Sequence, residues 1–372
     1  MEVSTLVIDN GSYTIRAGYG GDIEPSCVIP SVVGWVKGST SSTNTDGTNN
    51  YFIGADSLSC SSGIVLKRPI ENRIITNFDD IEKIWQHVFE NELHVKAEER
   101  PILMTESPEN TKAAREKTLQ IMMETFKVPA FYLSYPEVLS LFAAGITTGT
   151  VIDSGETLTH VLPVYECFGM THVCSRLEIG GRQLNGYLKK LMIQSGIELP
   201  TGYERESLRD IKEHLCYVAK DVDSEMQKIE QMNEIEKSFT FRNGTKIEIS
   251  SQRFKCTEPL FNPSLLKIDS PGISQLVFDT INKCDDLKPQ MFGNILLTGG
   301  TSMFNGFGER LDNELNKLNT SEKINVISLP NRKNCAWIGG SILVSLATFS
   351  QSWITKPEYD EVGPNIIHLK CF

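Results

Sequence analysis

The sequence lacks the features that mark secreted, membrane-spanning and nucleic-acid-binding proteins. No apolar run approaches the ~18 residues that cross a bilayer, and the N-terminus lacks the apolar core of a signal peptide. The 36 basic residues are outnumbered by 47 acidic ones, which gives a net charge of −11. They form no cluster, whereas a nucleic-acid-binding domain normally has a basic face. We therefore expect no membrane span and no direct contact with nucleic acid.

Disulfide and metal-binding cysteine patterns are also missing. The nine cysteines are scattered and odd in number, and no two of them form a Cys-x-x-Cys pair. This usage is typical of reduced thiols inside the cell. With 372 residues, 40% of them hydrophobic, the chain can form two or three domains or one two-lobed body. We expect a soluble intracellular protein.

One short motif occurs twice, as LVIDNGS at residues 6–12 and TVIDSGE at residues 150–156. Each copy predicts a buried strand that enters a tight turn, where glycine accepts positive φ and lets a ligand approach the backbone. Two such turns facing each other would present N–H groups to one phosphate chain, and Asp9 and Asp153 would hold Mg²⁺ through water. Either copy alone is typical of an ordinary turn. Together, each behind a similar apolar strand, they favour a phosphate and magnesium site.

Strand-like and helix-like segments alternate along the chain, which predicts an α/β sheet covered by helices. Apolar spacing predicts one helix that starts within 76–79 and another that is capped by Asn110. A glycine-rich turn at 299–301 follows a buried strand, and free N–H groups there would make a further phosphate or ribose contact. Residues 38–50 contain no apolar side chain, so we expect a mobile, exposed loop.

Several segments resemble actin segments and follow in actin order. They are IDNGS (8–12), LKRPIENRIITNFDDIEKIW (66–85), PENTKAAREK (108–117), IDSGETLTH (152–160), RDIKEHLCYVA (209–219), LTGGTSM (297–303), WIGGSIL (337–343), ITKPEYDEVGP (354–364) and the terminal KCF. The resemblance covers essentially the whole chain. It implies the duplicated, two-lobed α/β fold that actin shares with Hsp70 and sugar kinases (RNase H-like), with a nucleotide cleft between the lobes.

The resemblance also implies how the chain is divided. The first lobe would comprise residues 1–135 plus 334–372, with a small inserted subdomain at about 31–68 that carries the loop 38–50. The second lobe would comprise residues 136–333, with an inserted subdomain at about 181–269.

A site for ATP or ADP with Mg²⁺ follows from the same resemblance. It places two phosphate hairpins at 11–15 and 155–158, Asp9 and Asp153 near the cation, and His160 beside the attacking water, although a buried structural histidine is an equal alternative. The implied nucleotide contacts are Gly11, Ser12, Tyr13, Thr14, Arg16, Gly155, Glu156, Thr157, Leu158, Gly181, Arg209, Lys212, Glu213, Gly300, Thr301, Met303, Phe304 and Lys333.

Four positions depart from the family pattern near the phosphates. Tyr13 and Thr157 stand where the family has glycine, which implies a narrowed site. Pro136 replaces the glutamine that orients the attacking water, and loss of such a group typically costs ~10²–10⁴ in rate. Arg16 replaces a lysine and keeps the charge with a different shape. We expect weakened nucleotide binding and weak or absent ATP hydrolysis.

Two further departures concern partners. The loop 38–50 lacks the apolar anchors that join actin subunits, and the acidic tail that the family offers to myosin is reduced to Glu2. We expect poor homopolymerisation, and a cytoplasmic, cytoskeletal assembly subunit that meets actin, other actin-related subunits and their binding proteins. Two alternatives stay open: an active ATPase that polymerises or copolymerises with actin, and a nuclear actin-related subunit of a chromatin-remodelling complex. A small-molecule kinase is disfavoured, because the resemblance extends well beyond the nucleotide site.

Overall fold

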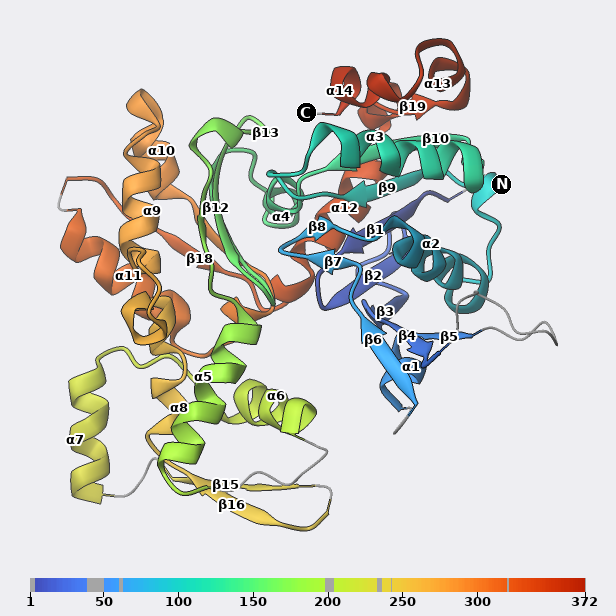
Figure 1. Cartoon of the computed structure of the whole chain (residues 1–372). Helices are drawn as coiled ribbons and strands as arrows, with labels where there is room; N and C mark the ends of the chain where they lie inside the picture. Colours follow the sequence, from blue (N-terminus) through green and yellow to red (C-terminus); the bar gives the residue numbers. More distant parts are fainter. Residues whose placement is uncertain are drawn as a thin grey trace. The chain divides into compact units, whose positions relative to one another are not determined.

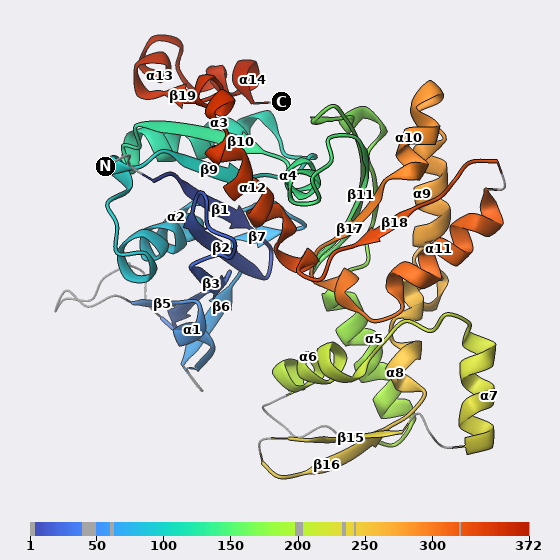
Figure 2. The same cartoon turned by 180° about the vertical axis from the view of Figure 1, so that it is seen from behind.

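The computed structural model describes residues 4–38, 50–59, 63–197, 204–232, 236–241, 243–319 and 321–371. Glu2 and residues 39–49 of the predicted mobile loop lie outside the described residues. Contacts divide the chain into two compact units, each of which is visible from both sides in Figures 1 and 2. Unit 1 comprises residues 1–147, 164–171 and 334–372, and unit 2 comprises residues 148–163 and 172–333.

Unit 1 is built on a six-stranded sheet in the order β19-β10-β9-β1-β2-β3. Strand β1 runs parallel to β9 and antiparallel to β2, with which it forms the first hairpin. A smaller sheet has the order β5-β4-β6. The bounds are β1 (Leu6–Asn10), β2 (Thr14–Tyr19), β3 (Cys27–Pro30), β4 (Val33–Val36), β5 (Tyr51–Ile53), α1 (Ala55–Ser59), β6 (Ile64–Lys67), β7 (Ile70–Glu71), β8 (Ile74–Ile75), α2 (Phe78–His87), β9 (Ile102–Thr105), α3 (Lys112–Gln120), β10 (Ala130–Ser134), α4 (Pro136–Ala143), β13 (Phe168–Gly169), α12 (Cys335–Ser345), β19 (Ile354–Thr355), α13 (Lys356–Val362) and α14 (Ile367–Lys370).

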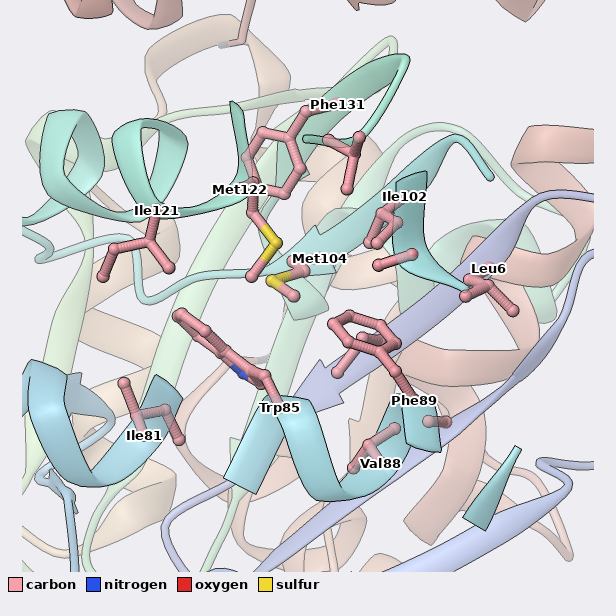
Figure 3. Packing of buried hydrophobic residues seen from close by; sticks show 14 of the residues in the cluster. Leu6, Ile81, Trp85, Val88, Phe89, Ile102, Met104, Ile121, Met122 and Phe131 are labelled. Atoms are coloured by element: carbon pink, nitrogen blue, oxygen red, sulfur yellow. The ribbon is translucent and has the colours of Figure 1, made fainter. Parts of the chain in front are cut away.

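Helices cover both faces of the large sheet of unit 1. Successive side chains of a strand point to opposite faces, so Leu6 and Ile8 pack in one cluster with Trp85 of α2, while Val7 packs in another with Trp337 of α12. Figure 3 shows the first cluster, and Figure 2 shows α12 on the side of the sheet away from α2. Trp337 Nε1 also donates a hydrogen bond to Val7 O at 3.0 Å, so a segment near the C-terminus is tied to the first strand.

Helix α4 belongs to unit 1, beyond the boundary at 135/136 that the sequence implied. It packs along α12, and a Cβ on Gly339 would lie 1.6 Å from Leu139 O. The backbones of the two helices therefore touch at a position where only glycine fits. The inserted subdomains expected at 31–68 and 181–269 stay predictions.

Two helices of unit 1 test the predicted caps. Asn77 caps α2, since its side chain accepts a hydrogen bond from the first turn, and this start is confirmed. Thr111 caps α3 in the same way, so the prediction of Asn110 is wrong by one residue. The Asn110 side chain donates to the carboxylate of Glu106 instead.

Unit 2 is built on a second sheet, in which β12, β11, β17 and β18 are neighbours and β14 pairs with β12. Strand β11 runs parallel to β17, which runs parallel to β18. Every residue of β11 and β17 is buried, as is typical of central parallel strands. The bounds are β11 (Gly149–Ser154), β12 (Thr159–Tyr165), β14 (Ser175–Leu177), α5 (Gly181–Gln194), α6 (Glu204–Leu215), α7 (Val222–Met232), β15 (Lys237–Thr240), β16 (Lys246–Ile249), α8 (Gln252–Lys255), α9 (Ile273–Ile281), α10 (Lys288–Gly293), β17 (Ile295–Thr298), α11 (Phe307–Leu318) and β18 (Val326–Ser328).

The predicted fold class is confirmed, because both units combine a mixed sheet with helices. Within the described residues, the helices are all too short or too polar to span a membrane.

Candidate functional site

The two copies of the repeated motif form the same turn. Between β1 and β2, the Gly11 N–H donates to Thr14 O at 3.1 Å, and between β11 and β12 the Gly155 N–H donates to Leu158 O at 3.1 Å. The duplication read in the sequence is therefore also present in the backbone hydrogen bonds.

The two aspartates of the motif occupy equivalent places in their sheets. Asp9 is the last residue but one of β1 and lies beside Thr105 of the parallel strand β9, whose hydroxyl donates to its carboxylate. Asp153 lies near the end of β11 and pairs in register with Thr298 of the parallel strand β17. Both aspartates are buried. They stand at the carboxyl ends of parallel strands, the edge at which open α/β sheets bind ligands.

Both carboxylate oxygens of Asp9 have partners within unit 1. Oδ1 accepts from Thr105 Oγ1 at 3.0 Å, and Oδ2 accepts from Arg16 Nη1 at 3.2 Å. Arg16 Nε donates in turn to Asn334 Oδ1 at 2.9 Å. Each oxygen keeps a second lone pair, but the neighbouring guanidinium of Arg16 repels a cation, so the arrangement fits Mg²⁺ that Asp9 holds through water.

The donor set fits a metal ion that is bound together with phosphate. In the part of the chain that the structure describes, no three His, Cys, Asp or Glu side chains gather into a group that could hold a metal ion. Mg²⁺ usually keeps several waters and takes one or two carboxylates plus substrate phosphates. Asp9 in unit 1 and Asp153 in unit 2 each supply one carboxylate, so waters and phosphate oxygens would have to complete a magnesium shell at either of them.

Side chains of the first hairpin are held by neighbours in unit 1. The Ser12 hydroxyl accepts from the Arg73 N–H at 3.1 Å. The Tyr13 ring stacks against the guanidinium of Arg68, with the ring centroid 4.9 Å from Cζ. Tyr13 O accepts from the Ser31 N–H at 2.8 Å. The ring therefore has a fixed partner, and the narrowing expected from Tyr13 stays a prediction.

The second hairpin is docked on the N-terminus of α5. The Gly181 N–H donates to Gly155 O at 3.0 Å, and the Arg182 N–H donates to Glu156 O at 2.7 Å. A Cβ on Gly180 would lie 2.7 Å from Gly155 O, so glycine is needed for this approach. These first N–H groups of α5 hold the hairpin and are not offered to an anion.

Three of the predicted nucleotide contacts meet around a fourth, Gly181. A Cβ there would lie 2.8 Å from Glu156 Oε2, 2.9 Å from Lys212 Nζ and 3.2 Å from Thr301 Oγ1. Lys212 Nζ donates to Gly181 O at 2.9 Å, and Thr301 Oγ1 donates to Gly155 O at 2.7 Å. The missing side chain leaves a polar cradle of a carboxylate, an ammonium and a hydroxyl. This chemistry suits the hydroxyl groups of a ribose.

Lys212 is the buried cation of this cradle. Its side chain is enclosed, with the residue 4% exposed. Burial lowers the pKa of its ammonium, while the negative charge of Glu156 acts in the opposite direction. A buried ammonium needs paired acceptors, and Gly181 O is one of them.

The turn after β17 packs on Asp153. Gly299 has φ +88°, and a Cβ there would lie 2.4 Å from Asp153 Oδ1. The Gly299 N–H donates to Arg332 O at 3.2 Å, and the Arg332 guanidinium donates to Ser302 O at 2.8 and 3.0 Å. The prediction of free N–H groups is therefore wrong for Gly299, because the strand-to-helix turn is closed by backbone bonds to a later segment.

The structure does not gather the other predicted nucleotide contacts of unit 2 into one group. Arg209 and Glu213 form an ion pair on α6, with Nε and Oε1 2.6 Å apart. A Cβ on Gly300 would meet open space, Phe304 is buried and Lys333 is exposed. Met303 is half-buried.

Three positions were expected to govern hydrolysis or triphosphate binding. Pro136 is the first residue of α4, where a helix tolerates proline because that N–H has no intrahelical partner. His160 is fully buried on β12, opposite Arg176 of β14, and its catalytic role stays a prediction. Thr157 Oγ1 is buried and, within the described residues, makes no hydrogen bond.

Three residues that hold Asp9, the first hairpin and the turn after β17 were not predicted from the sequence. Thr105 binds Asp9, Arg73 binds Ser12, and Arg332 closes the turn after β17. Thr105 left a signal, because it ends an apolar strand. Arg73 and Arg332 left none, because their partners are distant in the sequence.

A comparison with protein families assigns the chain. The family model named Actin matches residues 1–206 and residues 201–372. These two matches together span the sequence given, so they contain both hairpins and both aspartates. The match, the duplicated hairpins and the two α/β units agree, and the chain belongs to the actin family.

Proposed function

We propose that this chain is an actin-like assembly subunit that binds ATP or ADP with Mg²⁺ and hydrolyses ATP slowly or not at all. The observation that carries the proposal is the matching turn of the two hairpins, closed by the same N–H···O=C bond of 3.1 Å. Membership of the actin family supports it, because proteins of that fold generally bind nucleotide and a divalent cation.

Each part of the proposed ligand has a matching group in the chain. Backbone N–H groups at the hairpins that start at Gly11 and Gly155 suit phosphate oxygens. The cradle at Gly181 suits the ribose. Bound Mg²⁺ would neutralise phosphate charge, while Asp9 and Asp153 orient its waters.

Weak hydrolysis is proposed because of Pro136. At the position that resembles the water-orienting glutamine, proline offers neither a side-chain donor nor an acceptor, and such a loss typically costs ~10²–10⁴ in rate. Bound nucleotide still stabilises the folded form by about 2.7 kcal/mol at a concentration of 100 times Kd. An assembly subunit can therefore use nucleotide without turning it over.

The proposed partners and the proposed location in the cell each rest on a single observation. Family membership supports actin, actin-related subunits and their binding proteins as partners. The cytoplasm is proposed from the reduced-thiol pattern of the sequence alone.

Nucleotide content is the test. The purified protein is incubated with Mg-ATP, freed of unbound nucleotide, denatured and analysed by chromatography, with a parallel sample in which EDTA replaces Mg²⁺. We expect stoichiometric ATP that persists for hours with Mg²⁺ and is lost with EDTA. If most of the bound nucleotide is ADP, the active-ATPase alternative replaces the proposal of slow hydrolysis. Protein without nucleotide would contradict the proposal.

A further inference from the structure

We propose that Arg68 is a positioning residue of the first phosphate hairpin, because its guanidinium holds the Tyr13 ring to one side and keeps the hairpin backbone open to phosphate. The inference rests on the proposed nucleotide site. Tyr13 stands where the resemblance to actin implies glycine, and Arg68 limits the narrowing that this large side chain would otherwise cause.

The Tyr13 side chain projects from a tight turn. The Gly11 N–H closes the turn on Thr14 O at 3.1 Å, and Tyr13 lies between these two residues. A tyrosine side chain rotates about its first torsion between three staggered positions. At the tip of a turn, the ring can lie over the ligand side of the backbone or beside it. Only a ring beside the backbone leaves the N–H groups accessible.

Arg68 favours the position beside the backbone. Its Cζ lies 4.9 Å from the centroid of the Tyr13 ring, within the ~6 Å over which a cation is attracted to the face of an aromatic ring. Both residues are half-buried, and partial removal of water strengthens such an attraction. The guanidinium thus stabilises one ring position over the others.

Ser31 fixes the direction in which the ring is held. Its N–H donates to Tyr13 O at 2.8 Å, and its carbonyl oxygen accepts from Arg68 Nη1 at 3.4 Å. Ser31 is 0% exposed and directly follows β3. One buried residue therefore contacts both the main chain of the tyrosine and the cation that stacks on its ring.

The contacts of Tyr13 and those of Asp9 lie on opposite sides of the hairpin. In the sheet, the β1–β2 hairpin has β3 on one side and β9 on the other. Asp9 meets Thr105 on the β9 side, whereas Tyr13 and its stacking partner are both bonded to Ser31 on the β3 side. The stack therefore holds the ring away from the acid expected near Mg²⁺.

The main chain holds Arg68 in place for this contact. The next residue, Pro69, is buried and restricts the backbone of the residue before it. Pro69 O accepts from the Thr76 N–H at 2.8 Å and from Thr76 Oγ1 at 3.3 Å. Arg68 therefore extends from a fixed backbone. Such preorganisation reduces the ordering that remains to be done when a ligand binds.

The test is the affinity of Arg68→Gln for Mg-ATP, measured by calorimetric titration. Without the cation, the ring can occupy all three staggered positions, so the open one is populated about a third of the time. Apparent affinity falls in proportion to the fraction of chains that can bind, so we expect a loss of about threefold.

Lys67→Gln is the matched control for that variant. It removes the same charge from the neighbouring position, but the Lys67 ammonium lies over Trp35, 5.6 Å from the ring centroid. Its affinity for Mg-ATP should match that of the unsubstituted chain. A loss as large as that of Arg68→Gln would show a general effect of charge and overturn the inference.

A second background separates positioning of the ring from a direct contact of Arg68 with phosphate. Tyr13→Ala has no ring to place, so adding Arg68→Gln should not lower its affinity further. Tyr13→Phe keeps the ring, and there Arg68→Gln should again cost about threefold. Equal losses with and without the ring, or no loss in the unsubstituted chain, would contradict the role of Arg68.

Tyr13→Ala also decides the matter alone if Arg68→Gln does not fold by circular dichroism. A ring that is held aside obstructs little, so its removal should change the affinity by less than about twofold. A larger gain would mean that the ring covers the phosphate side despite Arg68, which sinks the inference. If the unsubstituted chain binds no Mg-ATP, the proposed function falls as well, whereas binding that does not depend on Arg68 removes only this inference.

Discussion

Gly299 packs against Asp153 so closely that a Cβ on the glycine would lie 2.4 Å from the carboxylate oxygen Oδ1. The two residues lie at the ends of the neighbouring parallel strands β17 and β11. The positive φ of Gly299 directs the chain back over the aspartate, and the missing side chain makes room for it. The acid expected near Mg²⁺ in unit 2 is thus covered by bare backbone on one side.

Gly299→Ala should destabilise the protein strongly. The new Cβ meets Asp153 and the residue must keep φ at +88°, and backbone strain of this kind alone costs about 1–3 kcal/mol. Gly300→Ala is the matched control, because its φ is −64° and its Cβ would meet open space. We expect the control to change the free energy of unfolding by less than about 0.5 kcal/mol. Urea unfolding measures both, and equal losses would contradict the account.

Gly181→Ala should weaken nucleotide binding more than it changes stability. Its Cβ would fill the cradle between Glu156, Lys212 and Thr301, whose contacting atoms are the ends of side chains and can shift. We expect affinity for ATP to fall by about tenfold or more, since small misplacements of binding groups are costly. Calorimetric titration measures this.

Gly186→Ala on the same helix is the control for that experiment. A Cβ there would meet nothing within 4 Å, and alanine favours a helix over glycine by about 0.5–1 kcal/mol. The control should bind ATP as the unsubstituted chain does and be slightly more stable. A similar loss of affinity in both variants would show that helix α5, and not the cradle, is what matters.

The stability of the protein should fall with rising pH because of Glu258. Burial raises the pKa of this carboxyl from its usual 4.5 to about 7, although Arg310 opposes the shift. Glu258 Oε1 has no hydrogen-bond partner in the described part of the chain. Since the folded form binds the proton more tightly than the unfolded form, the contribution is complete below about pH 4.5 and is lost as the pH rises through about 7.

Glu258→Gln removes this titration. Between about pH 5 and 8 we expect the unsubstituted chain to lose about 2–3 kcal/mol more of its free energy of unfolding than the variant does. Urea unfolding at several pH values measures the difference in slope. Parallel slopes would mean that Glu258 titrates normally in the folded protein.

Local signals predicted part of the site. The two Asp-x-Gly turns were visible because a buried strand, an acid and a glycine follow one another within a few residues. The start of α2 at Asn77 was visible for the same reason, since a cap and its helix are adjacent. At α3, two adjacent residues can both cap, and the hydrogen bond of Asn110 to Glu106, four residues earlier, takes Asn110 out of that role.

Long-range contacts account for what the sequence did not predict. Arg73 meets Glu137 across 64 residues, and Thr105 meets Asp9 across 96. Neither pair has a periodicity or a fixed spacing that a single sequence would reveal. The assignment of α4 to unit 1 also depends on a close contact, that of Gly339 with Leu139.

The bond from Trp337 to Val7, which spans 330 residues, has a consequence for the newborn chain. At the usual pace of ~5–20 residues per second, about 15–65 s separate the synthesis of its two ends. Until α12 has been made, the face of the sheet that carries Val7 lacks part of its cover, whereas residues 148–333 can already close most of unit 2. Synthesis of unit 2 begins after that of unit 1, yet unit 2 can finish folding first on the ribosome. The earliest strands of unit 1 therefore keep an apolar face exposed for the longest time.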